Sequence, residues 1–237
     1  MLSEYGTEQV GISAEIAIAD LSKVTVDSLY RQRGRAELSD HIKPAVSGLI
    51  AKLPKIDSHE AEGQNPIDFL LTGSKTLSVK SNMRELGKVA PQILGQPTDK
   101  TFWAKMPHLV PLGIDVQELS YQESARLFKS AAQSNIVELL GTYWNLLFHC
   151  DYIIWVYEVL GKDGELSNRP KAILLEKIKS PAWDETRISF TKNLDNWNES
   201  CTVKYNNVTI GEFQVHNNRN CFKFRFDGRG LVESGLI

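Results

Sequence analysis

Two isolated charges stand in a short apolar stretch, PIDFLLTGSKTLSVKSN, which covers residues 66–82. Asp68 lies within the first apolar run and Lys80 directly follows the second. A buried strand normally avoids such charges, because an unpaired charge is costly to remove from water. The stretch is therefore the first place to look for chemistry.

The segments 67–71 and 76–81, which contain the two apolar runs, are predicted to be strands, and the short turn between them contains Gly73. Such a connection favours an antiparallel pair. Because residues i and i+2 of a strand share a face, Ser78 and Lys80 should point together. With Asp68 near the same end of the neighbouring strand, a carboxylate and an ammonium group are expected to converge at a sheet edge.

This combination suits the hydrolysis of phosphodiesters. A hard cation held by carboxylates activates water and neutralises phosphate charge, and a lysine beside it can orient the water or stabilise the anionic transition state. Asp68 would then bind the metal, and Lys80 would orient the attacking water or stabilise the transition state. The structural alternative is an acid that caps a turn or pairs with a base, beside a solvated lysine at a strand end.

The spacing of these residues resembles a known motif. Pro66-Ile67-Asp68, nine residues, and then Ser78-Val79-Lys80 resemble the PD-(D/E)XK motif of the nuclease superfamily that includes most Type II restriction endonucleases. Ile67 separates Pro66 from Asp68, and Ser78 stands where the motif usually has Asp or Glu. Some restriction enzymes of the superfamily also carry serine there. The resemblance covers residues 10–100 and, more loosely, 205–226.

The resemblance implies that another carboxylate completes the metal site, typically a glutamate from the first helix of the core. Glu15 fits this role, because it is a lone acid among apolar residues of GISAEIAIADL. Glu37 and Glu85 are the alternatives, and an exposed helix position is the structural alternative for Glu15. Ser78 is a poor ligand for Mg²⁺, so we expect it to support the water or Lys80.

The resemblance also implies the partners and products. They are a Mg²⁺ cofactor, double-stranded DNA as substrate, and ends carrying 5′-phosphate and 3′-hydroxyl groups. Palindromic sites are matched by two-fold symmetry, which favours a homodimer. Two other functions stay open: a repair or junction nuclease of the same superfamily, and a catalytically inactive DNA-binding protein.

Two polar segments are candidates for DNA contacts, although a plain solvent-exposed surface is the alternative for both. Basic side chains position a protein on phosphates, while Asn, Gln and Arg can read base edges. The first segment, YRQRGR, provides Arg31, Arg33 and Arg35. The second, within residues 211–229, provides Gln214, His216, Asn217, Asn218, Arg219, Asn220, Lys223 and Arg225.

The surrounding pattern predicts a mixture of helices and strands. Helices are expected over 11–24, with Ser13 as a candidate N-cap, over 35–53, and over 117–144. A polar loop is expected over 55–66, and a strand buried on both faces over 152–160. Pro44 would kink the second helix or start its second half, and Gly141 would end or interrupt the third.

The C-terminal quarter changes to short alternating strands, with a tight hairpin turn expected at Asn206-Asn207. The predicted fold is therefore α/β (α+β), and the resemblance implies a PD-(D/E)XK core, a mixed sheet flanked by helices, followed by a β-rich region. One nuclease domain is expected over 1–237, with a catalytic core at about 10–160 and a DNA-recognition region at about 185–237.

The composition is that of an ordinary globular protein and does not by itself indicate a function. The 237 residues are 42% hydrophobic and carry a net charge of −2. This net charge neither indicates nor excludes a nucleic-acid partner. No apolar run is long enough to cross a membrane. The three cysteines lie far apart without a CxxC pair, which argues against a disulfide framework or structural zinc and favours a reducing cytoplasm. The resemblance implies that this cytoplasm is prokaryotic.

Overall fold

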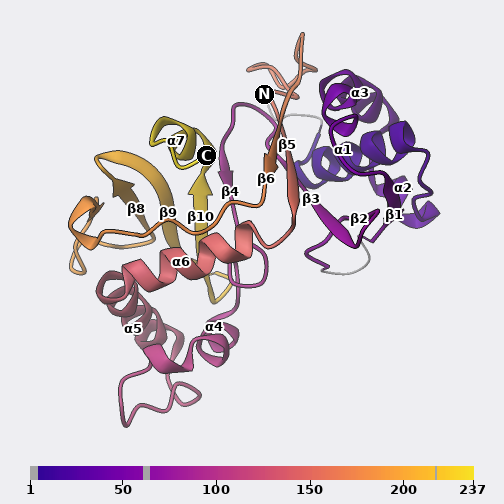
Figure 1. Ribbon diagram of the computed structural model, residues 1–237. Coiled ribbons are helices and arrows are strands. Elements are labelled where there is room, and N and C mark those ends of the chain that lie inside the picture. Colours follow the sequence, from indigo (N-terminus) through magenta and orange to yellow (C-terminus); the bar gives the residue numbers. More distant parts are fainter. Residues whose placement is uncertain (1–4, 61–64, 217) are drawn as a thin grey trace. The chain divides into compact units, whose positions relative to one another are not determined.

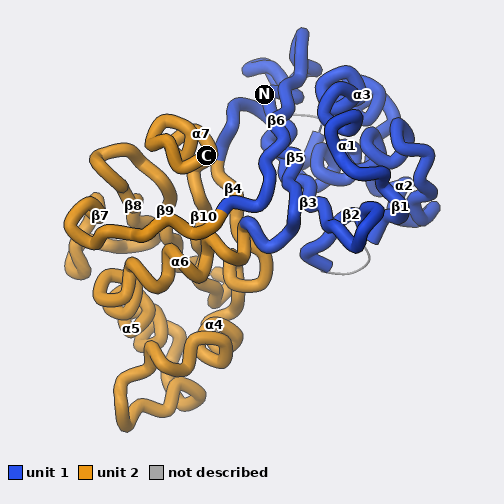
Figure 2. Tube along the Cα trace, in the orientation of Figure 1, with its two compact units in different colours: residues 1–87, 148–178 blue, residues 88–147, 179–237 orange. Residues whose placement is uncertain are grey.

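The computed structural model describes residues 5–60, 65–216 and 218–237. The chain forms two compact units, each built from two separate stretches of sequence (Figure 2). The first unit comprises residues 1–87 and 148–178, and the second comprises residues 88–147 and 179–237. Each unit contains its own five-stranded sheet.

The sheet of the first unit is mixed, with the order β1-β2-β3-β5-β6. Its strands are β1 (Ile56–His59), β2 (Phe69–Leu71), β3 (Lys75–Ser81), β5 (Tyr152–Tyr157) and β6 (Lys171–Glu176). β3 and β5 are parallel, and all other neighbours are antiparallel. The predicted antiparallel pair is thus confirmed, as is the predicted strand at 152–160, whose four central residues are buried.

Two helices of the first unit, α1 (Thr7–Ser22) and α3 (Ala36–Ile50), pack against each other and against this sheet (Figure 1). The short helix α2 (Ser28–Arg33) connects them. The buried apolar residues of α3, Leu38, Ile42 and Val46, repeat every fourth position, which turns one stripe of the helix towards the core. Leu77 and Val79 of β3 belong to the same core. By strand alternation, Ser78 and Lys80 therefore point to the other face of the sheet.

Ser13 is not the N-cap of α1, because the helix already begins at Thr7. Its buried hydroxyl instead donates to the carbonyl oxygen of Arg35 (3.3 Å) and accepts from the Arg35 backbone N–H (3.0 Å). At the adjoining Gly34, an added Cβ would lie 2.6 Å from Cδ1 of Ile16. The connection into α3 therefore lies directly on α1, held there by Ser13.

Replacing Ser13 with alanine is expected to lower the free energy of unfolding by about 1–3 kcal/mol, since buried backbone groups lose their partner. Chemical denaturation of the two proteins measures this difference. Ser47→Ala is the matched control, because that exposed hydroxyl bonds only within its own helix. Equal losses for the two variants would show that the buried hydroxyl does not fasten α3.

The sheet of the second unit is antiparallel throughout, with the order β4-β10-β9-β8-β7. Its strands are β4 (Lys88–Val89), β7 (Ile188–Phe190), β8 (Ser200–Tyr205), β9 (Val208–His216) and β10 (Cys221–Asp227). Asn206 and Asn207, between β8 and β9, have φ values of +49° and +66°, as a type I′ hairpin turn requires. The predicted C-terminal strands and hairpin are confirmed.

The helices of the second unit are α4 (Asp99–Lys105), α5 (Tyr121–Ser134), α6 (Ile136–Leu147) and α7 (Gly228–Glu233), with short 3₁₀ helices at Pro107–Leu109 and Glu185–Arg187. The helix predicted over 117–144 is therefore two helices. Their boundary is Asn135, the C-cap of α5, whereas Gly141 lies inside α6. Pro44 likewise lies inside α3 and does not divide it.

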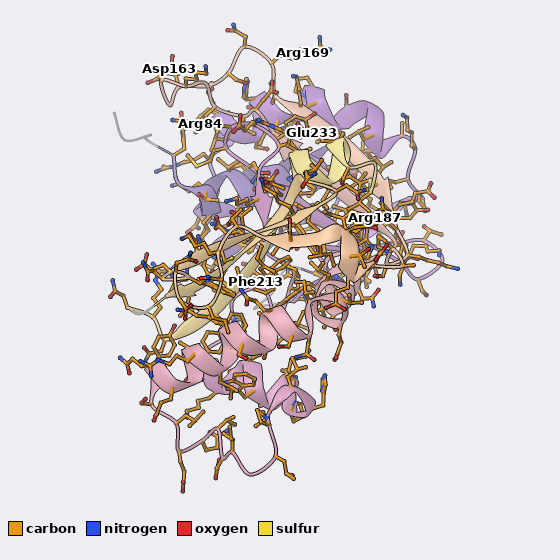
Figure 3. The ribbon with its side chains drawn as sticks, turned by 90° about the vertical axis from the view of Figure 1, so that its left-hand side faces the viewer. Arg84, Asp163, Arg169, Arg187, Phe213 and Glu233 are labelled. Carbon is orange, nitrogen blue, oxygen red and sulfur yellow. The ribbon has the colours of Figure 1, made fainter. Side chains whose placement is uncertain are left out.

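Aromatic rings fill the space between this second sheet and its helices. Phe128 of α5 stacks on Phe222, and Tyr143 of α6 stacks on Phe224, with ring centroids 4.1 and 4.4 Å apart. Phe213, labelled in Figure 3, contacts rings from both helices. Since strand residues alternate between faces, Lys223 and Arg225 must lie on the opposite, polar face of the sheet.

The architecture agrees with the predicted α/β (α+β) class, with helices and a mixed sheet followed by a β-rich region. The loop predicted over 55–66 is wrong in part, because β1 occupies Ile56–His59. This short polar edge strand forms because it pairs with β2, and its own sequence has no apolar pattern that would predict a strand. Among the described residues, no helix has the length and apolar character of a membrane span.

Candidate active site

Asp68 lies immediately before β2, between β1 and β3. Its carbonyl oxygen accepts from the Glu60 N–H (2.9 Å), and its own N–H donates to Leu77 (3.0 Å), so the backbone pairing of the sheet fixes its position. Its side-chain Oδ2 accepts from the Val79 N–H (2.5 Å) and from the Ser78 hydroxyl (3.0 Å). The carboxylate is thus held at β3, and Asp68 is only 7% exposed.

Ser78 links Lys80 to this carboxylate. Lys80 Nζ donates to Ser78 Oγ at 2.7 Å, and the same hydroxyl donates to Asp68. Ser78 and Lys80 are both buried. The three residues that the sequence singles out therefore form one continuous hydrogen-bonded group, Lys80–Ser78–Asp68, in which an ammonium and a carboxylate are joined through a hydroxyl.

Glu15 enters from the middle of α1 and is buried, with 8% of its surface exposed. Its Oε2 accepts from the hydroxyl of Tyr30 (2.7 Å) and from Nε2 of His59 (3.0 Å), the ring nitrogen that must carry the proton because a carboxylate only accepts. Burial and the neighbouring Glu15 raise the pKa of Tyr30 far above its usual value, so its hydroxyl remains a neutral donor.

The electrostatics of Asp68 show an excess of negative charge at this site. The pKa of Asp68 is raised from 3.8 to about 6, chiefly by burial and also by the negative charge of Glu15. Lys80 and the hydrogen bonds from Val79 and Ser78 act in the opposite direction but do not outweigh these effects. Two buried carboxylates therefore interact here, Asp68 with Lys80 close to it and Glu15 within the electrostatic reach of the exposed Arg33, an arrangement that an additional cation would stabilise.

The donor set fits a hard, oxygen-preferring cation. Mg²⁺ is usually bound through one or two carboxylates and keeps several waters, which matches Asp68 and Glu15. In the part of the chain that the structure describes, no three or more His, Cys, Asp or Glu side chains form a group able to hold a metal. A closed structural zinc site of four protein ligands would need such a group.

Glu37 and Glu85, the alternative glutamates, occupy different surroundings. Glu37 lies in the first turn of α3 and Glu85 follows β3, and both are exposed. Glu15 is the one of the three glutamates that is buried and interacts electrostatically with Asp68.

The three arginines of the predicted phosphate-contacting segment lie around α2. Arg31 forms an ion pair with Asp20 of α1 (2.7 Å). Arg33 forms an ion pair with Glu8 (2.5 Å), and its guanidinium lies over the ring of Tyr30. Arg35 is exposed and precedes α3. Exposed ion pairs of this kind are weak, so these arginines can exchange their partners for phosphates at little cost.

The C-terminal candidates gather on β9, β10 and the turn that joins them. Gln214 pairs with Lys223 across the strands, and His216 pairs with Cys221. Arg225 bonds to Glu212, the residue opposite it (2.9 Å). Asn218, Arg219 and Asn220 are exposed in the turn, whereas Asn217 lies outside the described residues.

Sequence reasoning missed His59, Tyr30 and Glu212. His59 and Tyr30 reach Glu15 from 44 and 15 residues away, and no local spacing encodes such contacts. Glu212 was detectable in principle, as an acid within the strand VTIGEFQVH. Burial alone would raise the pKa of Glu212, but hydrogen bonds from Lys88 and Arg225 lower it, so the carboxylate stays charged.

Comparison with known proteins gives one informative similarity. The chain is 32% identical, over 187 residues, to the Type II restriction enzyme CviAII of Paramecium bursaria Chlorella virus 1. The matched region covers 78% of this chain and 48% of that protein, so the chain spans about half the length of its relative. No family model and no solved structure matches the chain. Over most of its own length, the chain is therefore similar to a Type II restriction enzyme.

Proposed function

We propose that the protein is a Type II restriction endonuclease, which makes sequence-specific double-strand cuts in DNA by Mg²⁺-dependent hydrolysis. The observation that carries the proposal is the buried Lys80–Ser78–Asp68 group with Glu15 beside it. The similarity to a protein named a Type II restriction enzyme supports it independently of that geometry.

Each of the four side chains of the proposed site has its own role in hydrolysis. Asp68 and Glu15 hold Mg²⁺, which when bound supplies Lewis-acid stabilisation and a more acidic water. Lys80, fixed by Ser78, orients the attacking water and stabilises the negative charge that develops on the phosphate. Ser78 acts as a support because its hydroxyl is engaged by Lys80 and Asp68.

We infer a PD-(D/E)XK core from the helix and strands that position these residues. Glu15 comes from the first helix, Asp68 from the start of β2, and Ser78 and Lys80 from the adjacent β3. The mixed sheet carries Ser78 and Lys80 and positions Asp68, whereas α1, which packs on this sheet, carries Glu15. This arrangement agrees with the resemblance of the sequence to the PD-(D/E)XK motif.

The proposal is tested by incubating the purified protein with phage and plasmid DNA, with and without Mg²⁺, beside an Asp68→Ala control. Discrete bands that need Mg²⁺ and are lost in the variant are expected, and sequencing their ends gives the site. A smear would favour a nuclease directed by DNA structure. Intact DNA across many sequences and metals would favour a catalytically inactive DNA-binding protein.

We propose that the polar face of the second sheet contributes to DNA recognition. Lys223 lies beside Gln214 and Arg225 on this face, and its pKa is lowered by burial and then by the charge of Arg225. Nothing in the described chain forms an ion pair with Lys223, whereas Arg225 is held by Glu212. A phosphate would provide the counter-charge that Lys223 lacks.

Lys223→Ala is expected to weaken DNA binding uniformly across sequences and to reduce the slope of log affinity against log salt by about 1. Fluorescence anisotropy in EDTA, at several salt concentrations, measures both quantities. Lys105→Ala is the control, because that residue ends α4 on the helical side of the sheet. An unchanged salt slope for Lys223→Ala would remove this residue from the interface.

We further propose that the protein acts as a homodimer in a prokaryotic cytoplasm. A palindromic site presents two equivalent strands, and a two-fold pair of subunits cuts both in one encounter. Sedimentation with and without a DNA duplex containing the site distinguishes a dimer from a monomer.

A further inference from the structure

The two hydrogen bonds to Glu15 fall on the same oxygen. Tyr30 and His59 both donate to Oε2, at 2.7 and 3.0 Å. From the described part of the chain, Oε1 accepts no hydrogen bond. One oxygen of the carboxylate is thus fully engaged by protein donors, and the other is left for a ligand.

Both donors are themselves held by their surroundings. The Tyr30 backbone N–H donates to the cap residue Asp27 (3.0 Å) at the start of α2. The His59 side chain is 5% exposed, and its ring lies edge-on between the rings of Tyr30 and Phe69, with both centroids 5.0 Å away. The hydroxyl and the imidazole therefore cannot turn away from Glu15 without breaking these packing contacts.

His59 also connects Glu15 to the other carboxylate of the site. It pairs with Phe69 in the β1–β2 ladder, and Phe69 directly follows Asp68. Movement of His59 would therefore change where α1 presents its carboxylate relative to the strand that presents Asp68.

We propose that Tyr30 and His59 are positioning residues that fix Glu15 through Oε2 and reserve Oε1 for the cation it shares with Asp68. This inference rests on the proposed function, because it assigns roles at the same metal site. Outer partners that orient metal ligands typically contribute 10–100-fold to metal affinity. The role of His59 and Tyr30 is therefore expected in the affinity for Mg²⁺ and not in the chemical step.

The test compares variants that remove a donor with one that restores it. His59→Leu and Tyr30→Phe each delete a donor, whereas His59→Gln keeps an N–H at the end of its side chain. Mg²⁺ is titrated against the DNA-free protein by calorimetry, and the Mg²⁺ dependence of the cleavage rate is measured separately. His108→Leu is the matched control, because His108 pairs with Glu138 in an exposed His–Glu contact of the second unit.

We expect His59→Leu to raise the Mg²⁺ concentration at half-saturation by about 10–100-fold, in both measurements, with a near-normal cleavage rate at saturating Mg²⁺. Tyr30→Phe should act in the same direction, and His59→Gln should recover most of the affinity. His108→Leu should leave the titration unchanged. If His59→Leu does not fold, Tyr30→Phe decides the matter, because it removes a single oxygen and keeps the ring.

The outcomes separate the two proposals. Wild-type affinity for Mg²⁺ in both His59→Leu and Tyr30→Phe, together with its loss in Glu15→Gln, would overturn the positioning roles and leave the nuclease intact. A wild-type protein that shows no Mg²⁺ binding dependent on Asp68 would instead overturn the proposed function.

Discussion

Replacing Lys80 with methionine is expected to lower the rate of Mg²⁺-dependent DNA cleavage by about 10³-fold, the usual cost of removing one group that stabilises a developing anion. Methionine keeps an unbranched side chain, one atom shorter than that of lysine, and removes the charge and the donor. Lys80 is buried and bonded to Ser78, so its ammonium group is fixed before the substrate arrives. Single-turnover cleavage of a plasmid at saturating enzyme measures the change.

Lys75→Met is the matched control, since Lys75 belongs to the same strand but is half exposed and pairs with Asp151 (2.8 Å). It should cleave at the wild-type rate. Binding of DNA in EDTA should survive in both variants, which separates catalysis from affinity. A Lys80→Met protein that cleaves within tenfold of the wild type would remove Lys80 from the chemistry.

Replacing Asp68 with asparagine is expected to abolish cleavage and, in metal-free buffer at pH 8, to stabilise the fold by about 3 kcal/mol. This magnitude follows from a pKa of Asp68 that is raised from 3.8 to about 6, chiefly by burial, which makes its ionised form unfavourable in the folded protein. The amide oxygen of asparagine can still accept the hydrogen bonds of Val79 and Ser78. Added Mg²⁺ should reverse the order, because it stabilises only the wild type.

The pH dependence has a definite sign. A folded-state pKa above the unfolded value means that the folded protein binds the extra proton between about pH 6 and pH 3.8, so the cost of Asp68 is absent below this window and complete above it. The advantage of Asp68→Asn should therefore disappear near pH 4. Urea denaturation in EDTA at pH 4, 6 and 8 follows the difference.

Asp151→Asn provides the opposite case on the same sheet. Hydrogen bonds from Lys75 and Thr76 lower the pKa of Asp151, so its ionised form stabilises the folded protein above the usual carboxyl pKa. Its asparagine variant should lose stability at pH 8, with or without Mg²⁺. If Asp68→Asn behaves in the same way, Asp68 is a structural ion-pair partner and not a ligand awaiting a cation.

The part of the site that sequence could predict is the part that is local. Asp68 directly precedes β2, and Ser78 and Lys80 lie on the adjacent β3, so alternation and a short turn suffice to bring them together. Glu15 was detectable because an acid stands in an apolar helix. Its partners His59 and Tyr30 were not, since their contacts depend on how α1, α2 and β1 pack, and none of these contacts leaves a spacing in the sequence.

For the fold, too, the sequence predicted the local features and not those that depend on tertiary packing. Apolar periodicity located the strands at 69–71, 75–81 and 152–157, and paired asparagines located the β8–β9 turn. Periodicity could not place the break at Asn135, because apolar residues continue on both sides of it. It also could not find the two units, each of which is built from two separate stretches of sequence. The pairing of β3 with β5 joins such stretches, and it depends on tertiary packing.

The parallel pairing of β3 with β5 has a consequence for biosynthesis. Thr76 and Asp151 form a hydrogen bond although they are 75 positions apart in the chain, and most of the residues between them belong to the second unit. A ribosome therefore releases Asp68, Ser78 and Lys80 well before the strand that completes their sheet, and closing so long a loop carries an entropic cost. The nascent protein therefore contains the proposed catalytic residues early, whereas the sheet that positions them is complete only after β6 has been synthesised.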